Sequence, residues 1–492
     1  MARSWPRPPA VVVLAAGQGT RMKSSMAKVL HPVGGRPMGA RLLGELAALA
    51  PARIIVVVGY QAEAVRAALG AGAGPGASCG AGPAVSFVVQ EEQRGTGHAV
   101  LAAADELAGH DGPVVVVNGD LPLLGQDDVA ELIDTWQESG APAVLLTVEV
   151  EEPGRLGRIV RDERGRVARI VEAADATPRE MGIGEINVGA YCFTPEALFD
   201  ALRRVKPSRD KGEYYLVDVV ELLVRDGQRV LGVRGRRPER LLSVNSRAEL
   251  AAAEAALRKL TLERLMAGGV TVIDPATTLV EPEVEAAPDV TIGPFTIIRG
   301  RSRLLEGCEV GPGAVLINST VGRGARVVAS YIEDSVIGDE ATVGPYSHLR
   351  PNTTLESRVK VGNFAELKNS VVKRGAKVSH HSYIGDTDVG AKVNIGAGTV
   401  TVNYDGAKKH RTVIGDGAFI GCNANLIAPV TVGEGAYVAA GSTITAEVPG
   451  GALGVARARQ ENKPGWVERR RQRLEEEKRL AQQRPPEKRP YK

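Results

Sequence analysis

Residues 389–396 read VGAKVNIG, in which Val389-Gly390 is followed six residues later by Ile395-Gly396. Aliphatic–Gly pairs recur between Ile292 and Val432, and most intervals are six residues or a multiple of six. Other examples are Ile337-Gly338, Val343-Gly344, Ile414-Gly415 and Ile420-Gly421. This period predicts a triangular solenoid with one short strand per face, an inward aliphatic side chain on each rung, and Gly or Asn at corners where φ turns positive. A Gly-rich loop region would not keep the aliphatic residue in phase.

The bulk composition limits the other possibilities. A chain of 492 residues exceeds one hydrophobic core, and two domains are expected. The net charge of +3 gives no general argument for binding nucleic acid or membrane, although small anionic substrates fit. The cysteines, Cys79, Cys192, Cys308 and Cys422, are far apart and form no Cys-x-x-Cys pair, which favours a reducing, cytoplasmic protein over a disulfide or zinc framework. No stretch is long enough to span a bilayer.

Short apolar runs alternate with helical patterns up to about Asn245. Such alternation predicts βαβ units and a mostly parallel sheet with helices on both faces, and its ligands should sit beyond the carboxyl ends of the strands. The runs are residues 11–14, 54–58, 85–89, 114–117 and 144–148.

The domain boundaries follow from changes in pattern. Residues 247–266 contain no Gly or Pro and precede Gly268-Gly269, which predicts a connecting helix with a C-terminal stop. We therefore expect an α/β nucleotide-binding domain over residues 1–246, a helical linker over 247–268, and a left-handed parallel β-helix over 269–465. Residues 466–492 are expected to be a charged helix and frayed basic tail. The Gly/Ala/Pro-rich residues 70–83 indicate a flexible surface loop.

A small-residue loop directly follows the first predicted strand. It reads Leu14-Ala15-Ala16-Gly17-Gln18-Gly19-Thr20-Arg21-Met22, with Lys28 six residues later. Small residues let backbone N–H groups approach a base and a triphosphate, and Arg21 and Lys28 can neutralise phosphate charge. The loop lacks the last Gly of a Rossmann fingerprint and the Gly-Lys-Ser/Thr of a Walker A loop. The whole string resembles the sugar-1-phosphate nucleotidyltransferase family.

Further segments follow in that family's order. Gln90 and Gly95-Thr96 resemble the segment that holds uracil and lies beneath the nucleotide. Asn118-Gly119-Asp120 follows a buried strand and supplies one carboxylate, as a Mg²⁺ ion that bridges phosphates requires. Asn245 matches the family's second metal ligand. At the position of Asn118 some relatives have an aromatic residue. This difference affects the expected contact of residue 118 with the nucleotide and leaves the metal role of Asp120 unchanged.

The resemblance also implies the sugar and the reaction. Gly157, Glu172 and Asn187 correspond to positions that grip the amino sugar in the N-acetylglucosamine branch. The phosphate of the sugar 1-phosphate would attack the α-phosphorus of UTP and expel pyrophosphate, with Mg²⁺, Arg21 and Lys28 stabilising charge in the transition state.

Two segments interrupt the solenoid period, and such departures often carry function. They are Ser379-His380-His381-Ser382-Tyr383 and Asn403-Tyr404-Asp405-Gly406. The first resembles the catalytic turn of bacterial glucosamine-1-phosphate N-acetyltransferases, with His380 as the base rather than its neighbour His381. An imidazole can take a proton from the substrate ammonium as its nitrogen attacks a thioester.

The same resemblance assigns the other acetyl-transfer residues. The sugar-phosphate site would use Arg350, Lys368, Tyr383 and Asn394, and the acetyl-CoA site would use Ala397, Asn403, Tyr404, Cys422, Ala440 and Arg457. The Ala397 N–H would stabilise the oxyanion. Cys422 stands where relatives often have Ser and is a weaker hydrogen-bond partner. In this family three copies pack side by side with the coenzyme between neighbours, so a homotrimer is implied.

Nearly the whole chain is thus similar to the bacterial bifunctional family that makes UDP-N-acetylglucosamine, a precursor of peptidoglycan and lipopolysaccharide. The solenoid would acetylate glucosamine 1-phosphate, and the amino-terminal domain would join N-acetylglucosamine 1-phosphate to UMP. Two alternatives stay open: a nucleotidyltransferase for another sugar with a regulatory solenoid, and a non-catalytic assembly subunit. The His380, Asn403 and Tyr404 segments argue against the first, and Asp120 and Arg21 argue against the second.

Overall fold

The computed structural model describes residues 5–70, 83–208 and 212–483. The chain divides into two compact units, Met1–Glu333 and Asp334–Lys492. Most of the predicted loop at residues 70–83, with Cys79, lies outside the described residues, as does the end of the predicted tail.

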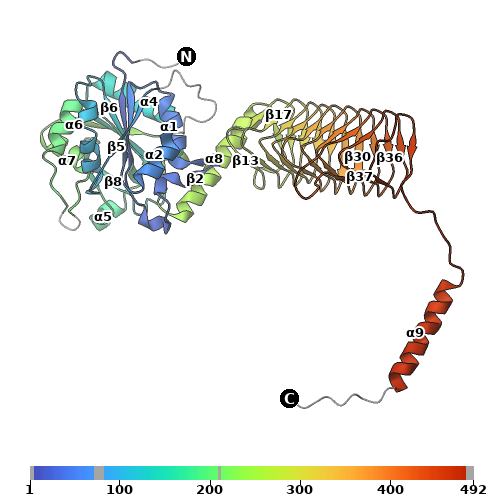
Figure 1. Ribbon diagram of the computed structural model, residues 1–492. Coiled ribbons are helices and arrows are strands. Elements are labelled where there is room, and N and C mark those ends of the chain that lie inside the picture. The colour runs from blue at the N-terminus through green and yellow to red at the C-terminus, as the bar shows by residue number, and fades with distance from the viewer. Residues whose placement is uncertain (1–4, 71–82, 209–211, 484–492) are drawn as a thin grey trace. The chain divides into compact units, whose positions relative to one another are not determined.

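A mixed sheet organises the first part of the chain (Figure 1). Strand β1 (Ala10–Ala15) lies between β4 (Arg53–Val58) and β6 (Val114–Asn118) and is parallel to both. The sheet order is β11-β7-β10-β6-β1-β4-β5, and β8 and β9 join at β10. The further strands are β5 (Val85–Val89), β7 (Ala143–Glu149), β8 (Arg158–Arg161), β9 (Val167–Val171), β10 (Glu185–Phe193) and β11 (Val230–Arg234), with a separate hairpin of β2 (Pro32–Val33) and β3 (Arg36–Pro37). All five predicted strands are confirmed, while β10 runs antiparallel to β6 and β7.

The strands of this sheet are apolar on both sides because helices cover both faces. In β1, Val11 and Val13 belong to one core and Ala10 and Val12 to the other. One core also takes side chains from α1, α2 and α4, and the other from α3, α6 and α7. The helices are α1 (Met38–Ala47), α2 (Ala62–Gly70), α3 (Thr96–Ala102), α4 (Gln126–Ser139), α5 (Pro178–Met181), α6 (Pro195–Leu202) and α7 (Val217–Arg225).

The predicted helix after Asn245 is present as α8 (Arg247–Ala267). The hydroxyl of Ser246 caps its start by accepting a hydrogen bond of 3.2 Å from the backbone N–H of Glu249. The helix ends at Gly268, and Gly269 has a φ of 91°. Its apolar side chains pack against a small cluster that includes Met38, Leu123 and Val244. The start of α8 is therefore anchored beside the loop that carries Asp120.

Residues 271–454 form three parallel sheets, which confirms the predicted parallel β-helix. The first sheet contains β12 (Thr271–Val272), β15 (Thr291–Ile292), β18 (Glu309–Val310), β21 (Arg326–Val327), β24 (Thr342–Val343), β27 (Lys360–Asn363), β30 (Lys377–His380), β33 (Asn394–Ile395), β36 (Phe419–Ile420), β39 (Tyr437–Val438) and β41 (Leu453–Gly454). The second contains β13 (Leu279–Val280), β16 (Ile297–Arg299), β19 (Val315–Ile317), β22 (Tyr331–Glu333), β25 (His348–Leu349), β28 (Glu366–Lys368), β31 (Tyr383–Gly385), β34 (Val400–Val402), β37 (Asn425–Ile427) and β40 (Thr443–Ile444). The third contains β14 (Glu285–Ala286), β17 (Arg303–Leu304), β20 (Thr320–Val321), β23 (Val336–Ile337), β26 (Thr354–Leu355), β29 (Val371–Val372), β32 (Thr387–Val389), β35 (Thr412–Ile414) and β38 (Val430–Val432).

The glycines of the aliphatic–Gly pairs have a different role from the one that the period suggests. Of the six pairs, only Gly344 has a positive φ. At Gly396 an added Cβ would lie 2.6 Å from the backbone nitrogen of Cys422 in the next coil, and at Gly421 one would lie 2.5 Å from that of Ala440. These glycines are needed because neighbouring coils approach each other closely.

The corners with positive φ accept residues other than Gly and Asn. Phe364 and His381 have φ values of 57° and 42°, and they are joined to the preceding coil by backbone hydrogen bonds of 3.0 Å each. Hydrogen bonds of this kind offset the cost of the left-handed conformation. The prediction of Gly or Asn at every such corner was therefore wrong.

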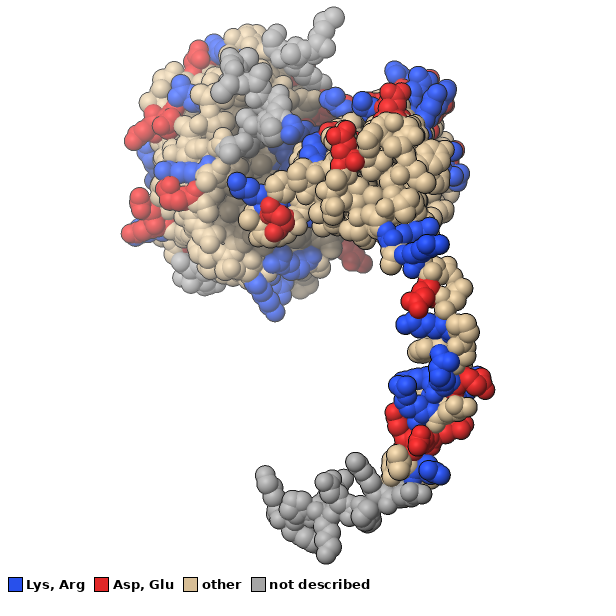
Figure 2. Space-filling model, turned by 45° about the vertical axis from the view of Figure 1, so that its right-hand side comes forward, with Lys and Arg blue, Asp and Glu red and all other residues tan. Residues whose placement is uncertain are grey.

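Helix α9 (Trp466–Gln483) confirms the predicted charged helix. Figure 2 shows Lys/Arg and Asp/Glu side chains interspersed along it. Cys192, Cys308 and Cys422 are free thiols, and burial raises the pKa of Cys308 to about 12. Among the described residues, no helix is long and apolar enough to cross a membrane.

Candidate functional site

The small-residue loop forms one wall of a cavity of about 300 Å³ at the carboxyl ends of β1, β5 and β6. A Cβ on Gly17 would meet no atom within 4 Å, so this backbone faces open space. Gly119 does not line the cavity: its N–H donates to the Leu14 carbonyl at 2.9 Å and holds the two loops together. The predicted residues that line it are Leu14, Ala15, Ala16, Gly17, Lys28, Gln90, Gly95, Thr96, Asn118 and Asp120.

The two predicted metal ligands, Asp120 and Asn245, both contact the side chain of Lys28. The Lys28 ammonium lies 2.5 Å from Asp120 Oδ2 and 3.0 Å from Asn245 Oδ1. Asp120 is 8 % exposed, and its other oxygen, Oδ1, is buried with no hydrogen-bond partner among the residues that the structure describes. A buried carboxylate oxygen without a partner, beside an amide oxygen, is a donor set that suits a hard divalent cation. No cluster of three or more His, Cys, Asp or Glu able to hold a metal occurs in the described part of the chain.

Asn245 is held from two sides. Its Nδ2 donates to the Ser243 hydroxyl at 2.9 Å, which turns Oδ1 toward Lys28. Its backbone N–H donates to Glu249 Oε2 at 2.7 Å, in the first turn of α8. The anchored helix therefore fixes the position of this ligand.

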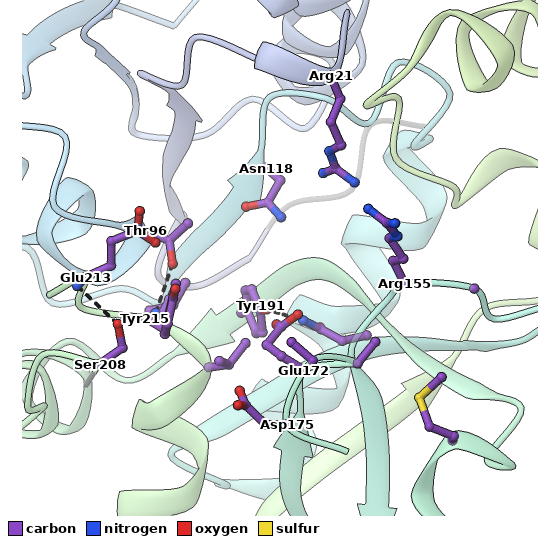
Figure 3. A pocket seen from close by; sticks show the side chains of 17 residues that line it. Arg21, Thr96, Asn118, Arg155, Glu172, Asp175, Tyr191, Ser208, Glu213 and Tyr215 are labelled. Carbon is purple, nitrogen blue, oxygen red and sulfur yellow. Dashed lines mark hydrogen bonds between the residues drawn. The ribbon is translucent and has the colours of Figure 1, made fainter. Parts of the chain in front are cut away.

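A larger cavity of about 1030 Å³ adjoins the first and contains the predicted sugar-binding side chains Glu172 and Asn187 (Figure 3). Arg21 extends into it. The Asn187 amide donates to the Tyr191 hydroxyl at 2.7 Å, and burial raises the pKa of that phenol, which stays protonated. Gly157, Asn245 and Asp120 line a neighbouring hollow together with Arg21 and Glu172. The structure thus brings the two groups of predicted residues into adjoining spaces.

Some lining residues were missed by the sequence reasoning. Arg155 and Tyr215 line the larger cavity, and the carboxylate of Glu213 lies at its edge (Figure 3). The only available signal was the position of Arg155 two residues before Gly157. Tyr215 is far from every motif in sequence, and the fold brings it to the site through a hydrogen bond from Leu216 N–H to Thr96 Oγ1 at 3.0 Å.

The predicted acetyl-transfer base lies at the end of β30. His380 pairs in register with Asn363 of β27, and its Nδ1 lies 2.8 Å from Asn363 Oδ1. Because that amide oxygen can only accept, Nδ1 carries a proton, and in the neutral ring the lone pair is on Nε2. His381 instead occupies the corner with positive φ. Asn363, which the sequence reasoning missed, therefore gives His380 the tautomer that a base requires.

Lys368 of β28 is one of three cations that gather together. Lys409 and Arg350 lower the pKa of Lys368, with Lys409 the larger influence. Arg350 also donates a hydrogen bond of 2.9 Å to Oε1 of Glu366. Like charges held this close favour an anionic ligand such as a phosphate. Lys409 belongs to the loop after Asn403 and had no sequence signal beyond that interruption.

Tyr383, predicted to contact the sugar, shares a hydrogen-bonded network with Asn403, predicted to contact the coenzyme. The Asn403 amide donates to Asp386 and, at 3.4 Å, to the Tyr383 hydroxyl. Asp386 also accepts a bond of 2.5 Å from Asn369 and is 6 % exposed. Asn394 points outward from β33 one coil beyond Lys377. Tyr383, Asn394 and Asn403 are therefore displayed on neighbouring coils.

The predicted coenzyme residues follow His380 along one corner of the β-helix. Three of them come directly before a corner residue: Ala397 before Gly398, Cys422 before Asn423, and Ala440 before Gly441. Backbone hydrogen bonds of 2.7–2.8 Å link these successive corners. The N–H of Ala397 makes no hydrogen bond within the described residues. Arg457 follows Ala456, whose N–H donates to the Ser442 hydroxyl at the same corner. Tyr404 does not lie at this corner. It is 57 % exposed, and its hydroxyl donates a hydrogen bond to the carbonyl oxygen of Gly406.

The tip that carries Tyr404 is fixed by its own contacts. Asp405 accepts hydrogen bonds from the backbone of Ala407 and Lys408, and from His410 at 2.6 Å. The bond from Lys408 is the largest of the effects that lower the pKa of Asp405. The loop is thus held as a defined projection beside the cation cluster.

Comparisons with known proteins agree with this division. Residues 11–224 match the family model of the MobA-like NTP transferase domain, residues 331–416 that of the GMPPB C-terminal domain, and residues 411–446 that of the bacterial transferase hexapeptide. The fold and the sites define a nucleotidyltransferase combined with a hexapeptide transferase.

Full-length relatives give the particular family. The Bifunctional protein GlmU of Geobacillus sp. (strain WCH70) is 46% identical over 458 residues, which cover 93% of this chain and 97% of that protein. The Bifunctional protein GlmU of Listeria monocytogenes serotype 4a (strain HCC23) is 44% identical over 456 residues, with 93% and 97% covered. The chain belongs to the GlmU family of bifunctional enzymes.

Proposed function

We propose that this enzyme makes UDP-N-acetylglucosamine by two reactions on two separate sites. Acetyl-CoA acetylates glucosamine 1-phosphate on the β-helix, and UTP then uridylylates the product in the amino-terminal domain. Two groups of residues in one chain carry the proposal. Lys28 contacts Asp120 and Asn245 at the nucleotide cavity, and the β-helix holds both His380, paired with Asn363, and a three-cation cluster. Family membership over nearly the full length supports both activities.

In the uridylyl transfer, a phosphate oxygen of N-acetylglucosamine 1-phosphate forms a bond to the α-phosphorus of UTP while the bond to pyrophosphate breaks. Arg21 and Lys28 stabilise the negative charge that the phosphates carry in the transition state. Gly157, Glu172 and Asn187 orient the sugar, and the Leu14–Gly17 backbone and Gln90 hold the nucleotide.

We assign Asp120 and Asn245 as the residues that hold Mg²⁺. The partnerless oxygen of Asp120 and the Asn245 amide oxygen support this assignment, since both suit a hard cation. When bound, the ion supplies Lewis-acid stabilisation of the phosphates. The Lys28 ammonium contacts an oxygen of each of these residues and lies within reach of the same phosphates.

In the acetyl transfer, the sugar's amino nitrogen forms a bond to the thioester carbonyl as Nε2 of His380 takes its proton. Asn363 holds the imidazole in the required tautomer. The Ala397 N–H stabilises the oxyanion, which collapses as the C–S bond breaks and the coenzyme A thiol leaves. Arg350 and Lys368 bind the sugar phosphate, with Tyr383 and Asn394 on the sugar. Asn403, Tyr404, Cys422, Ala440 and Arg457 bind the coenzyme.

The remaining assignments rest on family resemblance. We propose domain limits of 1–246, 247–268, 269–465 and 466–492, a cytoplasmic location, small-molecule partners without nucleic acid or membrane, and a homotrimer. The trimer is supported by the exposed position of Tyr404 and of the corner that carries the coenzyme residues, because a coenzyme there needs cover from a neighbouring surface.

Two assays test the proposal. Incubation with UTP, Mg²⁺ and N-acetylglucosamine 1-phosphate should release pyrophosphate, and incubation with acetyl-CoA and glucosamine 1-phosphate should release free thiol. Thiol release is the more decisive result, because nucleotidyl transfer is common to related families. Pyrophosphate release without thiol release would indicate a nucleotidyltransferase whose β-helix has another role.

A further inference from the structure

The Gln90 side chain, which the proposed function assigns to the uracil, is held in one orientation. Gln90 follows β5, is 4 % exposed and lines the nucleotide cavity. Its Nε2 lies 3.1 Å from the carbonyl oxygen of Gly95 and 3.0 Å from Nδ1 of His98. A carbonyl oxygen can only accept, so the atom that faces Gly95 is the NH₂ group and not the amide oxygen.

This orientation also fixes the state of His98. The NH₂ group has two hydrogens, and with one given to Gly95 the other is directed at His98 Nδ1. Nδ1 must therefore accept, which makes His98 a neutral imidazole with its proton on Nε2. The Gln90 oxygen, Oε1, has no hydrogen-bond partner within the described residues. It is left to accept a hydrogen bond from a ligand.

His98 cannot easily move away from this contact, because the start of its helix is tied to residues 214–216 by two hydrogen bonds. The N–H of Gly97, its neighbour in α3, donates to the carbonyl of Tyr214 at 2.8 Å. The Thr96 hydroxyl, one residue earlier, accepts from the backbone of Leu216 at 3.0 Å. The imidazole is thus presented to Gln90 from a rigid support.

The chemistry of the pyrimidine bases gives the arrangement a consequence. Uracil has an N–H donor at N3, which an outward amide oxygen can accept. Cytosine has a lone pair at N3, which faces the same oxygen without a proton between them. A site built to accept a hydrogen bond rejects a base that cannot donate it, because the buried acceptor is left unpaired.

We propose that His98 is a positioning residue for base selection: it holds the Gln90 amide so that Oε1, and not the NH₂ group, faces the nucleotide. The inference rests on the proposed assignment of Gln90 to the base. It extends that assignment by naming what makes Gln90 selective, since a freely rotating amide could donate to cytosine N3 as well as accept from uracil N3.

A matched pair of variants tests this role. His98→Leu removes the acceptor at similar volume, whereas His98→Asn places an amide oxygen near the position of Nδ1. For each variant, kcat/KM is measured with UTP and with CTP by pyrophosphate release, with Mg²⁺ and N-acetylglucosamine 1-phosphate. We expect His98→Leu to lower the UTP/CTP ratio about tenfold, the effect of one buried hydrogen bond, and His98→Asn to restore most of it. A general loss of structure would lower both rates and leave the ratio unchanged.

Gln90→Leu separates this inference from the assignment on which it rests. Loss of the UTP preference in Gln90→Leu and in His98→Leu, with recovery in His98→Asn, supports the proposal. If Gln90→Leu keeps the preference for UTP over CTP, Gln90 does not select the base, and the proposed role of His98 is also overturned. If Gln90→Leu loses the preference but His98→Leu keeps it, the base assignment stands and the role of His98 is overturned. Thiol release from acetyl-CoA, measured on the same preparations, should be unchanged by the His98 variants.

Discussion

The two sites proposed for this enzyme are built in opposite ways. The nucleotide site is a set of adjoining cavities at the carboxyl ends of a sheet, where Asp120 and Gln90 are almost fully buried. The acetyl-transfer site is displayed on the outside of a stack of coils, where His380 is exposed and Tyr404 projects. The difference teaches that an α/β domain can enclose a ligand within its own fold, whereas this solenoid presents its proposed site on an open surface, which is why we propose that a second copy completes it.

The largest expected effects come from single substitutions that test whether the two proposed sites act independently. His380→Ala should lower thiol release by about 10²–10⁴-fold, the usual contribution of a general base, and leave uridylyl transfer within twofold. Asp120→Ala should produce the reverse pattern through loss of the metal ligand. His381→Ala is the matched control and should leave both rates near wild type. Loss of both activities from either single change in a folded protein would contradict two autonomous sites.

The next effect concerns Lys28, which occupies the space between the two metal ligands. Lys28→Met should lower uridylyl transfer about 100-fold, because the phosphates lose a charged partner. In the absence of nucleotide the same variant should bind Mn²⁺ about tenfold more tightly, since the ammonium no longer competes for Asp120 and Asn245. Electron paramagnetic resonance of free Mn²⁺ measures this binding. Unchanged or weaker binding would show that Lys28 does not stand in for the metal.

A smaller effect is expected from Asn363, because it acts on His380 only through the tautomer. Asn363→Leu should lower acetyl transfer about tenfold, in line with the loss of one hydrogen bond. Asn363→Asp keeps the acceptor but adds a negative charge that favours the imidazolium. The acid limb of the acetylation rate should therefore move to higher pH, which a pH profile of thiol release would detect. A profile that stays in place in Asn363→Asp would argue against contact between the two side chains in solution.

The smallest effect concerns the cation cluster. Lys409→Ala removes the larger of the influences that lower the pKa of Lys368, so that pKa should rise toward its ordinary value. The KM for glucosamine 1-phosphate should rise about fivefold, because one of three cations is lost while Arg350 and Lys368 remain. Added salt should reduce the difference between variant and wild type. Lys408→Ala, one residue earlier in the same loop, is the control.

Much of this molecule follows from sequence because its patterns are local. The five predicted strands and the solenoid period depend on which side chains are apolar, and the loop from Leu14 to Met22 carries its small residues in one run. Asn363, Lys409 and Arg155 could not be found in this way, because their roles come from register between coils or from loops that meet only in the fold. The reason for the glycines was also misread, since the close approach is between residues of successive coils that are far apart in sequence, such as Gly421 and Ala440 or Gly396 and Cys422.

The tight contact between Gly396 and the following coil has a consequence for evolution. His380 and Ala397, the proposed base and oxyanion donor, lie on adjacent coils, so the distance between their backbones is set by the repeat of the β-helix and not by the packing of any side chain. Substitutions elsewhere on the surface can accumulate without detuning the reaction. By contrast, one residue inserted between His380 and Ala397 would change the register of one residue relative to the other. We expect this insertion to abolish acetylation in a protein that still folds.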